Sequence, residues 1–229
     1  MVWYNAAIGD SYIMVGPEAQ SSQHHEILDP NLVEVRFGDP IVDAPRLREL
    51  WTQKTAIEHM AAITPYITED EIKELYKGDG AVLLTAETPS GLIIETYSIY
   101  RPGHGSLVGE GGKLVVDEKY RGLRIVSKLI KAGNAVMFEE GYGEFGTNKS
   151  QVYVITGVKD DQIPQRAYER EGYLKDEPNI GCTYSWSNEL NKLVLRNSQP
   201  MHLYKSAHLQ NCSGEYEQFY PKPRPIQLA

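Results

Sequence analysis

The stretch VVDEKYRGLRIVSKLIKAG, residues 115–133, decides the fold class of this chain. It begins with β-branched residues typical of a buried strand and passes through the charged turn DEKYRG into a basic segment with apolar periodicity. Ile125, Leu129 and Val136 mark one buried stripe of a helix that we expect over residues 121–138. The start of a helix exposes unpaired N–H groups and the positive end of the helix dipole, so a phosphate can bind there.

The charges of Arg121, Arg124 and Lys128 add to this positive end. Taken alone, the junction is a weak signal. The alternative is an ordinary strand-to-helix connection whose basic residues only line a solvated rim. Other motifs in the sequence are needed to distinguish a phosphate-binding site from such a connection.

The composition bounds the class of protein. The chain has 229 residues, enough for one domain with appendages, and a formal net charge of -8. This charge disfavours non-specific binding of nucleic acid and fits an amine-bearing substrate slightly better than an anionic one. Cys182 and Cys212 are expected to be reduced thiols, with a single disulfide as the alternative. No signal peptide is expected at the N-terminus, and no apolar run approaches the roughly 20 residues of a membrane span, so we predict a cytoplasmic protein.

Hydrophobic periodicity predicts the element order β-α-α-β-β-β-α-β-α-β. Asp43 is a candidate N-cap, and Thr68 with Glu71 forms a capping box. The predicted strands cover residues 32–37, 81–87, 92–100, 110–116, 152–158 and 182–187, and the predicted helices cover residues 43–63, 69–77, 121–138 and about ten residues that end near Gly172. A helix joins the fourth and fifth strands, so we expect these two to be parallel in a mostly antiparallel sheet.

The chain divides into three predicted parts. Residues 1–30 are an N-terminal arm, residues 31–187 are the core, and residues 188–229 are an extension that packs on the core or is partly extended. The last predicted strand ends at residue 187.

A second motif, AYEREGY at residues 167–173, favours a functional interpretation of the junction at residues 115–133. Together with the element order and the DEKYRG turn, it resembles the GNAT superfamily of acetyl-CoA-dependent N-acyltransferases. The resemblance covers about Leu32 to Trp186. It implies an α/β fold with a mixed, mostly antiparallel sheet flanked by helices, in which a central parallel pair of strands is splayed.

The resemblance also implies a binding site for acetyl-CoA. In the family, a pattern Gln/Arg-x-x-Gly-x-Gly/Ala begins the helix and binds the pyrophosphate through its amides. The pattern matches residues 121–126, but both glycine positions differ, being Arg124 and Val126. Arg124 could pair with a phosphate, or the two departures could mean that acyl-CoA binding is weakened or lost. The residues implied in binding are Leu114, Val115 and Val116, whose backbone would pair with the pantetheine arm, and Arg121, Gly122, Leu123, Arg124, Ile125, Val126 and Ser127 at the pyrophosphate.

Two residues are candidates for proton transfer. Tyr168 matches the family tyrosine that often protonates the departing CoA thiolate, and a phenol with a pKa near 10 stays protonated for this task. Its alternative is a packed tyrosine on an amphipathic helix. Glu110 lies eleven residues before Arg121, where related lysine acetyltransferases can carry the base that deprotonates the amine.

Other residues are weaker candidates for the site. His104, in the loop RPGHGS, is the second choice for the base. Glu95 and Tyr97 lie on the preceding strand and are expected near the acceptor pocket, although alternation alone does not say which face either takes. No metal site is predicted.

The predicted function is therefore transfer of an acetyl or similar acyl group from acyl-CoA to an amine by direct attack. The acceptor would be an amine-bearing small molecule, a protein lysine or an N-terminus, and the protein a monomer or homodimer without membrane contact. Two alternatives stay open: a degenerate GNAT-fold binding module without catalysis, and a GNAT-like enzyme that modifies nucleic acid with help from the tyrosine-rich C-terminal extension.

Overall fold

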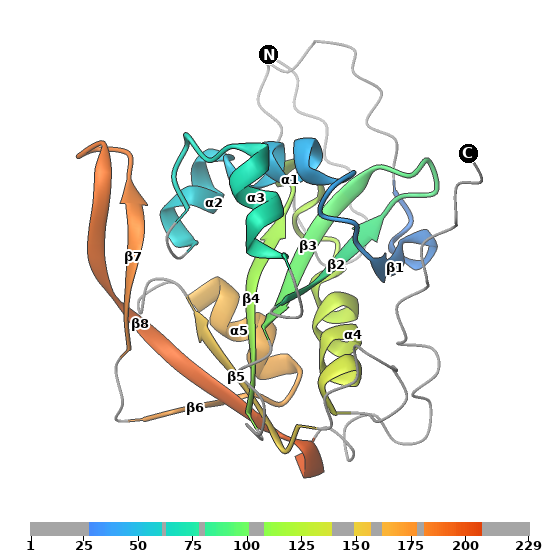
Figure 1. The fold of residues 1–229 in the computed structure, drawn as a ribbon. Coiled ribbons are helices and arrows are strands. Elements are labelled where there is room, and N and C mark those ends of the chain that lie inside the picture. Colours follow the sequence, from blue (N-terminus) through green and yellow to red (C-terminus); the bar gives the residue numbers. More distant parts are fainter. Residues whose placement is uncertain are drawn as a thin grey trace, which may run out of the picture.

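The structure is a computed structural model, and it describes residues 28–60, 63–77, 81–100, 108–138, 149–156, 162–177 and 181–207 (Figure 1). Several residues named above lie outside these ranges. They are residues 1–27 of the predicted N-terminal segment, His104, Cys212 and the chain beyond residue 207.

The described residues form strands on both sides of a helical crossover. The strands are β1 (Glu34–Phe37), β2 (Ala81–Glu87), β3 (Ile93–Tyr100), β4 (Val108–Val116), β5 (Gln151–Thr156), β6 (Leu174–Lys175), β7 (Gly181–Ser187) and β8 (Lys192–Tyr204). The helices are α1 (Ala44–Trp51), α2 (Lys54–His59), α3 (Glu69–Leu75), α4 (Val126–Phe138) and α5 (Gln162–Arg170), and two short 3-10 turns are η1 (Pro30–Leu32) and η2 (Glu118–Tyr120).

The strands assemble into one sheet in the order β1-β2-β3-β4-β5-β8-β6, and β7 pairs with the far end of β8. Within the described residues, β4 and β5 are parallel neighbours, and the other strand pairs are antiparallel. The predicted fold class, a mostly antiparallel sheet with one central parallel pair, is confirmed. The parallel pair follows from α4, which returns the chain to the same end of the sheet.

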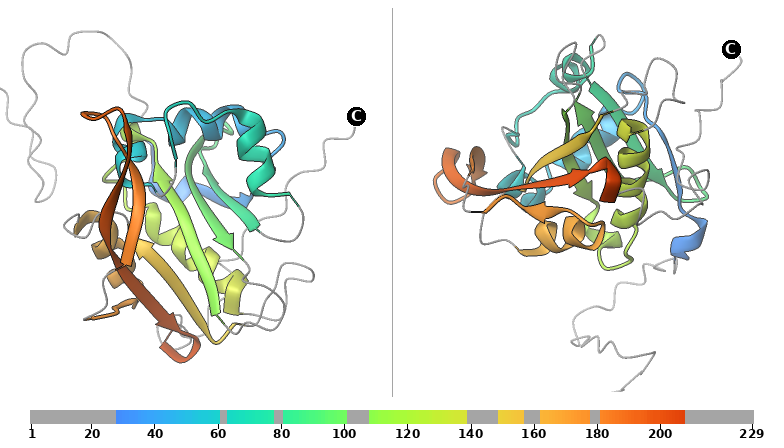
Figure 2. Two further views of the ribbon diagram at one scale, coloured as in Figure 1. Left: turned by 60° about the vertical axis from the view of Figure 1, so that its left-hand side comes forward. Right: turned by 90° about the horizontal axis from the view of Figure 1, so that it is seen from below.

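Helices cover both faces of the sheet, and a separate apolar cluster fills each interface (Figures 1 and 2). The first cluster joins α4 and α5 to one face of β2, β3 and β5, and the predicted stripe residues Ile125, Leu129 and Val136 are all in it. The second joins α1, α2 and α3 to the other face and includes Trp186 from β7.

The sequence analysis missed β8, a strand of 13 residues that follows the predicted last strand. Its first half pairs with β7 over residues 192–198, and its second half pairs with β5 over residues 199–204. The first half is mostly exposed, so its pattern carries little apolar signal, and its partners lie far away in sequence. Part of the predicted C-terminal extension therefore lies inside the sheet.

The hairpin formed by residues 181–198, which we call the arm, stands away from the rest of the sheet in Figure 1 and reaches α2. Trp186 packs edge-on against Tyr66, with ring centroids 5.7 Å apart. Asn188 Nδ2 donates a hydrogen bond of 2.6 Å to Glu58 Oε1. These contacts anchor the end of the arm beside the helices.

Helix boundaries differ from the predicted ones. The predicted helix 43–63 is two helices, α1 and α2, and α4 begins at Val126 rather than at Arg121. The capping box of Thr68 and Glu71 is confirmed at the start of α3.

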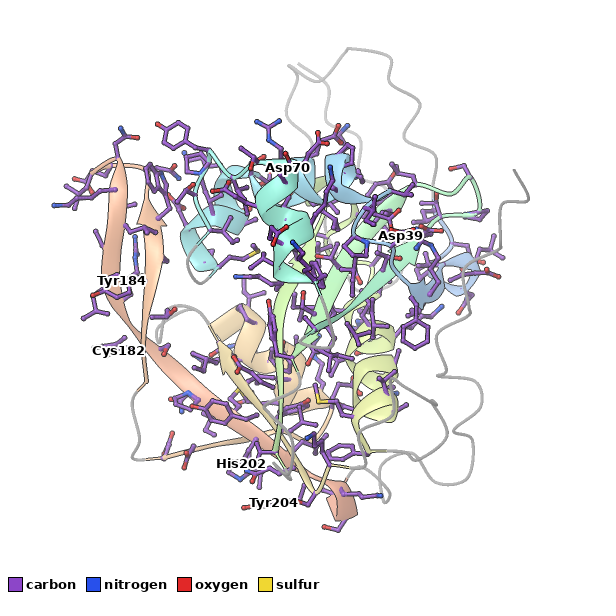
Figure 3. All side chains as sticks on the ribbon, in the orientation of Figure 1. Asp39, Asp70, Cys182, Tyr184, His202 and Tyr204 are labelled. Carbon is purple, nitrogen blue, oxygen red and sulfur yellow. The ribbon has the colours of Figure 1, made fainter. Side chains whose placement is uncertain are left out.

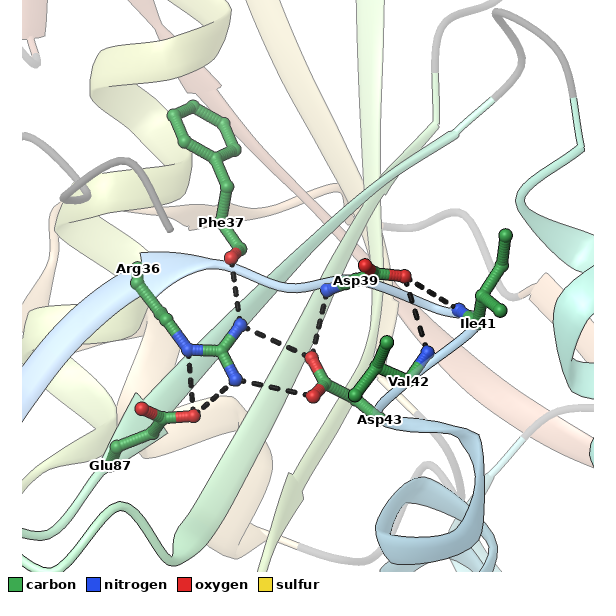
Figure 4. A network of polar contacts seen from close by, with 7 residues as sticks. All are labelled: Arg36, Phe37, Asp39, Ile41, Val42, Asp43 and Glu87. Carbon is green, nitrogen blue, oxygen red and sulfur yellow. Dashed lines mark hydrogen bonds and ion pairs between the residues drawn. The ribbon is translucent and has the colours of Figure 1, made fainter. Parts of the chain in front are cut away.

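The sequence analysis expected Asp43 to cap α1. Its side chain makes no capping hydrogen bond to that helix. Its carboxylate instead accepts hydrogen bonds from the Arg36 guanidinium, at 3.1 and 3.2 Å, and from Asp39 N–H at 2.8 Å (Figure 4). Arg36 also pairs with Glu87 on β2. These charge-assisted hydrogen bonds from a partly buried guanidinium are stronger than the single bond from a helix N–H that capping would give. The network ties β1, β2 and the start of α1 together.

Candidate active site

The parallel strands β4 and β5 separate partway along their length. They pair from Val108 with Gln151 to Gly111 with Val154, and no pairing follows. β4 continues alone on that side to Val116, and β5 continues to Thr156. In the described chain, the backbone edge of β4 from Gly112 to Val116 that faces β5 is therefore free of strand partners, and the predicted splay is confirmed.

A β-bulge lies in β4 directly after the last paired residue. Thr96 pairs with Val115 and Ser98 with Gly112, so the two residues Lys113 and Leu114 stand opposite the single residue Tyr97. Lys113 has a positive φ of 52°, and its carbonyl accepts a hydrogen bond of 3.2 Å from Thr96 Oγ1. A bulge turns the strand away from its old plane, which explains why β4 leaves β5 at this point.

The turn after β4 exposes backbone donors. The N–H groups of Leu123 to Ser127 make no hydrogen bond with another residue in the described part of the chain. Gly122 and Arg124 both have positive φ, 87° and 58°. Because the first N–H groups of a helix lack intrahelical partners, this turn is suited to bind an anion. Arg124, one of the two departures from the family pattern, thus adopts the left-handed conformation that a glycine adopts freely.

Contacts from β4 and α1 hold the turn in place. Asp117 is buried, and its Oδ2 lies 2.5 Å from Arg46 Nη2, while Arg46 Nε donates to the Ile93 carbonyl at 2.9 Å. Asp117 Oδ1 accepts from Lys119 N–H at 2.9 Å. The fold therefore fixes the first residues of the turn before any ligand arrives.

Arg121 and Lys128 have partners within the protein. The Arg121 side chain, 43% exposed, donates to Thr55 and lies 3.7 Å from Glu118. Lys128 Nζ donates to the carbonyls of Pro30, at 2.7 Å, and Val33, at 3.3 Å. The Lys128 ammonium group thus anchors η1 to α4, and its contribution of charge to the phosphate turn stays a prediction.

Tyr168 lies on α5 within the apolar cluster that α5 shares with α4. Only 4% of its surface is exposed, and its ring meets that of Tyr173 edge-on, with centroids 5.1 Å apart. Burial raises the pKa of the Tyr168 phenol well above its usual value. The phenol is therefore a protonated donor at every physiological pH.

Glu110 points to the opposite face. Its neighbours Gly109 and Gly111 lie against Met137 of α4 and Tyr97, so alternation directs Glu110 away from α4. Burial raises the pKa of the Glu110 carboxyl, and the charge of Lys113 opposes this shift. The two candidate proton-transfer residues thus lie on opposite faces of the sheet, beside the residue where β4 and β5 part.

A row of polar side chains crosses four strands on the Glu110 face. Tyr100, Glu110, Tyr153 and His202 are direct partners in neighbouring strands, so their side chains point to the same side. Figure 3 labels His202 near the lower end of β8. The sequence analysis did not name Tyr100, Tyr153 or His202 as site residues, and only the strand register reveals them.

Glu95 and Tyr97 face α4, not the side of Glu110. Their direct partners on β2, Ala86 and Leu84, belong to the cluster under α4 and α5. Glu95 is 1% exposed, and burial raises the pKa of its carboxyl to about 8. Glu95 and Tyr97 therefore lie on the face of the sheet that α4 and α5 cover, opposite the face of Glu110.

Three further findings concern the described residues only. No group of three or more metal-binding side chains gathers there. Cys182 is an exposed free thiol on the arm (Figure 3). No helix in these ranges has both the length and the apolar character needed to cross a membrane.

The fold is shared with solved N-acetyltransferases. Spermidine N-acetyltransferase from Vibrio cholerae, solved with CoA and spermine, superposes with a TM-score of 0.63 at 14% identity, covering 78% of this chain and 99% of that one. A GCN5-related N-acetyltransferase from Kribbella flavida gives a TM-score of 0.57 at 15% identity, covering 76% and 99%. A putative phosphinothricin N-acetyltransferase gives 0.57 at 14%, covering 76% and 98%.

No protein-family model matches the chain, and no curated protein matches it in sequence. The structural likeness is strong while the identity is low. It establishes that this chain has the GNAT fold, as its motifs predicted.

Proposed function

We propose that the protein is an N-acyltransferase that moves an acetyl or similar acyl group from acyl-CoA to an amine. The observation that carries the proposal is the splay between β4 and β5 beside a turn with free N–H groups. An unpaired strand edge can accept an extended amide-bearing chain as an added strand, and the turn can accept its phosphates. The GNAT fold of solved CoA-dependent enzymes supports the same function.

The binding roles follow from the free backbone groups. Leu114, Val115 and Val116 present the unpaired edge of β4 to the pantetheine arm, and the turn from Arg121 to Ser127 holds the pyrophosphate. Arg124 is exposed and adds a positive charge to that turn. Backbone carries most of this binding, so the site tolerates the absence of both family glycines.

The reaction is a direct transfer in which Glu110 and Tyr168 act from opposite faces. Glu110 takes a proton from the ammonium group of the acceptor, and the free amine attacks the thioester carbonyl. The C–N bond forms, the C–S bond breaks, and Tyr168 protonates the leaving thiolate. No residue is acylated, so no nucleophilic side chain is required.

The acceptor binds on the face of Glu110. A carboxylate flanked by Tyr100 and Tyr153 suits an ammonium group, since tyrosine faces attract cations. The net charge of -8 and the spermine bound by the solved neighbour point to the same class of acceptor. We therefore propose a small organic amine as the acceptor.

The decisive experiment combines calorimetric titration of acetyl-CoA with a thiol-release screen over small amines, including spermidine. In the Tyr168→Phe variant we expect kcat to fall by about 100-fold, because a general acid typically contributes 100-fold to 10,000-fold. The Kd for acetyl-CoA should stay unchanged, since the backbone turn and the β4 edge carry the binding.

Tyr184→Phe is the matched control, because Tyr184 is a 57% exposed tyrosine on the arm. It should retain the wild-type kcat. A wild-type protein that binds acetyl-CoA but releases no thiol with any amine would be a binding module instead. Absence of acetyl-CoA binding at millimolar concentration would end the acyltransferase proposal.

A further inference from the structure

Three polar groups of the arm have no hydrogen-bond partner. The hydroxyl groups of Ser185 and Ser198, on residues that are 0% exposed, and the Nε of Arg196 are buried without a hydrogen bond in the described structure. No carboxylate of the described residues forms an ion pair with the half-buried Arg196 either. Buried polar groups are normally hydrogen-bonded, and buried charges are normally paired, because burial removes their hydration. These three groups therefore lack a partner that the described chain does not supply.

Strand register places the three side chains on one face of the arm. Arg196 of β8 is the direct partner of Thr183 of β7. Ser198 lies two residues after Arg196 on β8, and Ser185 lies two residues after Thr183 on β7. Alternate residues of a strand point to the same side, so both serines share the face of Arg196. Each serine lies about 7 Å from Arg196 between Cα atoms, so one small ligand group can lie among all three side chains.

A glycine leaves room at this face. Gly181 on β7 is the direct partner of Ser198, and a Cβ at position 181 would lie only 2.6 Å from Ser198 Oγ. Without that Cβ, no side chain of β7 at this position covers the hydroxyl. A hydroxyl rotates to suit its neighbours, so Ser198 and Ser185 can each direct a proton at a bound group.

The same face continues along β8 to the acceptor side of the sheet. His202 lies four residues after Ser198 on β8. It is the direct partner of Tyr153, which is in turn the partner of Glu110. Neither pairing of β8 contains a register shift, so the alternation is unbroken from the arm to His202. The three polar side chains and Glu110 therefore belong to one continuous face.

A guanidinium beside two hydroxyl groups suits an acidic ligand group. The planar fork of an arginine matches a carboxylate or a phosphate, and serine hydroxyls donate to the same oxygens. The charge of Arg196 would repel a cationic group. An apolar group would leave all three donors unsatisfied. The partner that completes this site is therefore a carboxylate or a phosphate.

We propose that Arg196, Ser185 and Ser198 bind an acidic group of the acceptor, a carboxylate or a phosphate, while the amine of the same molecule lies at Glu110. This inference rests on the acyl transfer proposed above, and it narrows the acceptor to amines that also carry an acidic group. The acidic group takes no part in bond making. It holds the far end of the acceptor on the arm, so these three residues determine specificity and not the chemical step.

The test measures thiol release from acetyl-CoA by the full-length protein with three matched series of acceptors. They are linear ω-amino acids from aminobutanoate to aminododecanoate, aminoalkyl phosphates, and α,ω-diamines of the same chain lengths. At the length that spans Glu110 and Arg196, kcat/KM should be about tenfold higher for an acid-bearing amine than for the diamine. In Arg196→Gln this preference should disappear. The KM for the acid-bearing acceptor should rise by about 10-fold to 100-fold, the range for a hydrogen bond to a charged group, with little change in kcat.

Lys192→Gln is the matched control, because it removes an exposed cation from the same strand of the arm. It should keep the wild-type preference for acid-bearing amines. Arg196→Gln should leave the Tm unchanged or higher, since the substitution breaks no ion pair within the described chain. A lower Tm with an unchanged acceptor preference would show a purely structural arginine and overturn the site.

The outcomes separate this inference from the function on which it rests. Diamines that react as well as the acid-bearing amines would overturn the site and leave acyl transfer standing. A higher Kd for acetyl-CoA in Arg196→Gln, with an unchanged acceptor preference, would assign Arg196 to a phosphate of the donor and likewise overturn the proposal. Calorimetric titration of the ω-amino acids tests the site without the reaction. Binding that Arg196→Gln abolishes would support the site even in a protein that releases no thiol, and absence of both binding and thiol release would overturn both proposals.

Discussion

Arg124 stands in a backbone conformation that costs an arginine free energy. At a φ of 58° its Cβ is crowded, and the left-handed region costs a residue other than glycine about 1–2 kcal/mol. The family pattern places glycine at this position, which avoids the cost. Because the sequence here retains a cation instead, we attribute to Arg124 a gain in binding that the backbone alone does not supply.

We predict two opposite effects of Arg124→Gly. The free energy of unfolding should rise by about 1 kcal/mol, since the strain is relieved. The affinity for acetyl-CoA should fall by about tenfold and become less sensitive to salt, since one phosphate contact is lost. Urea unfolding and calorimetric titration measure the two effects.

Arg124→Lys is the matched control, because it keeps the charge and the strain. It should retain most of the affinity. If Arg124→Gly binds acetyl-CoA as tightly as the wild type does, the Arg124 side chain contributes nothing to acetyl-CoA binding.

At the scale of the elements, strand register builds the acceptor face. Glu110 lies between Tyr100 on β3 and Tyr153 on β5, and this row continues to His202 on β8. Each of these residues is separated from the next by a loop or a helix in sequence, so no motif contains the row. The bulge at Lys113 and Leu114 then turns β4 away just beyond Glu110.

This register leads to a pH prediction for Glu110. A base must be ionised to act, so kcat/KM should rise with pH through the pKa of Glu110. Burial raises that pKa, so the acidic limb should lie above the ordinary glutamate value of 4.5. Glu110→Gln should abolish the limb and lower kcat/KM by about 100-fold. The pH–rate profile of both proteins provides the measurement.

Glu87→Gln serves as the control, because Glu87 lies at the far end of β2 and pairs with Arg36. It should keep the acidic limb, even if its stability falls. An acidic limb that persists in Glu110→Gln would assign the base to another residue.

At the scale of the whole molecule, the sheet separates two apolar clusters, and one carboxyl is buried inside the first. Glu95 faces this cluster with Oε2 unpartnered in the described structure, and burial raises its pKa to about 8. Its folded-state pKa is therefore above its unfolded value, so the native state holds a proton that the unfolded chain releases. The stability that this carboxyl contributes is fully present below about pH 4.5.

We predict that this stability is lost as the pH rises from about 4.5 to about 8. Over this window, the free energy of unfolding of the wild type should fall relative to that of Glu95→Gln by at most about 1.4 kcal/mol per pH unit. Urea unfolding across this range measures the difference.

Glu189→Gln, at the exposed turn of the arm, should show no such divergence from the wild type. A constant difference between Glu95→Gln and the wild type at every pH would show that Glu95 is ionised in the folded protein.

The sequence by itself determined the strand-turn-helix junction at 115–133, the order of the core elements and the parallel pair. It did so because periodicity, caps and the helical crossover are local properties. It also brought Glu110 and Tyr168 into consideration through motif positions, although their roles stay predictions.

Only the tertiary structure decided which face each side chain takes, where β4 leaves β5, and that β8 completes the sheet. These features depend on register and on the bulge, which are set by contacts between residues far apart in the chain. A shift of one residue in a strand moves every side chain to the other face. For that reason only the structure shows that Tyr97, whose face alternation left open, lies behind Gly111 and against Gly133 of α4.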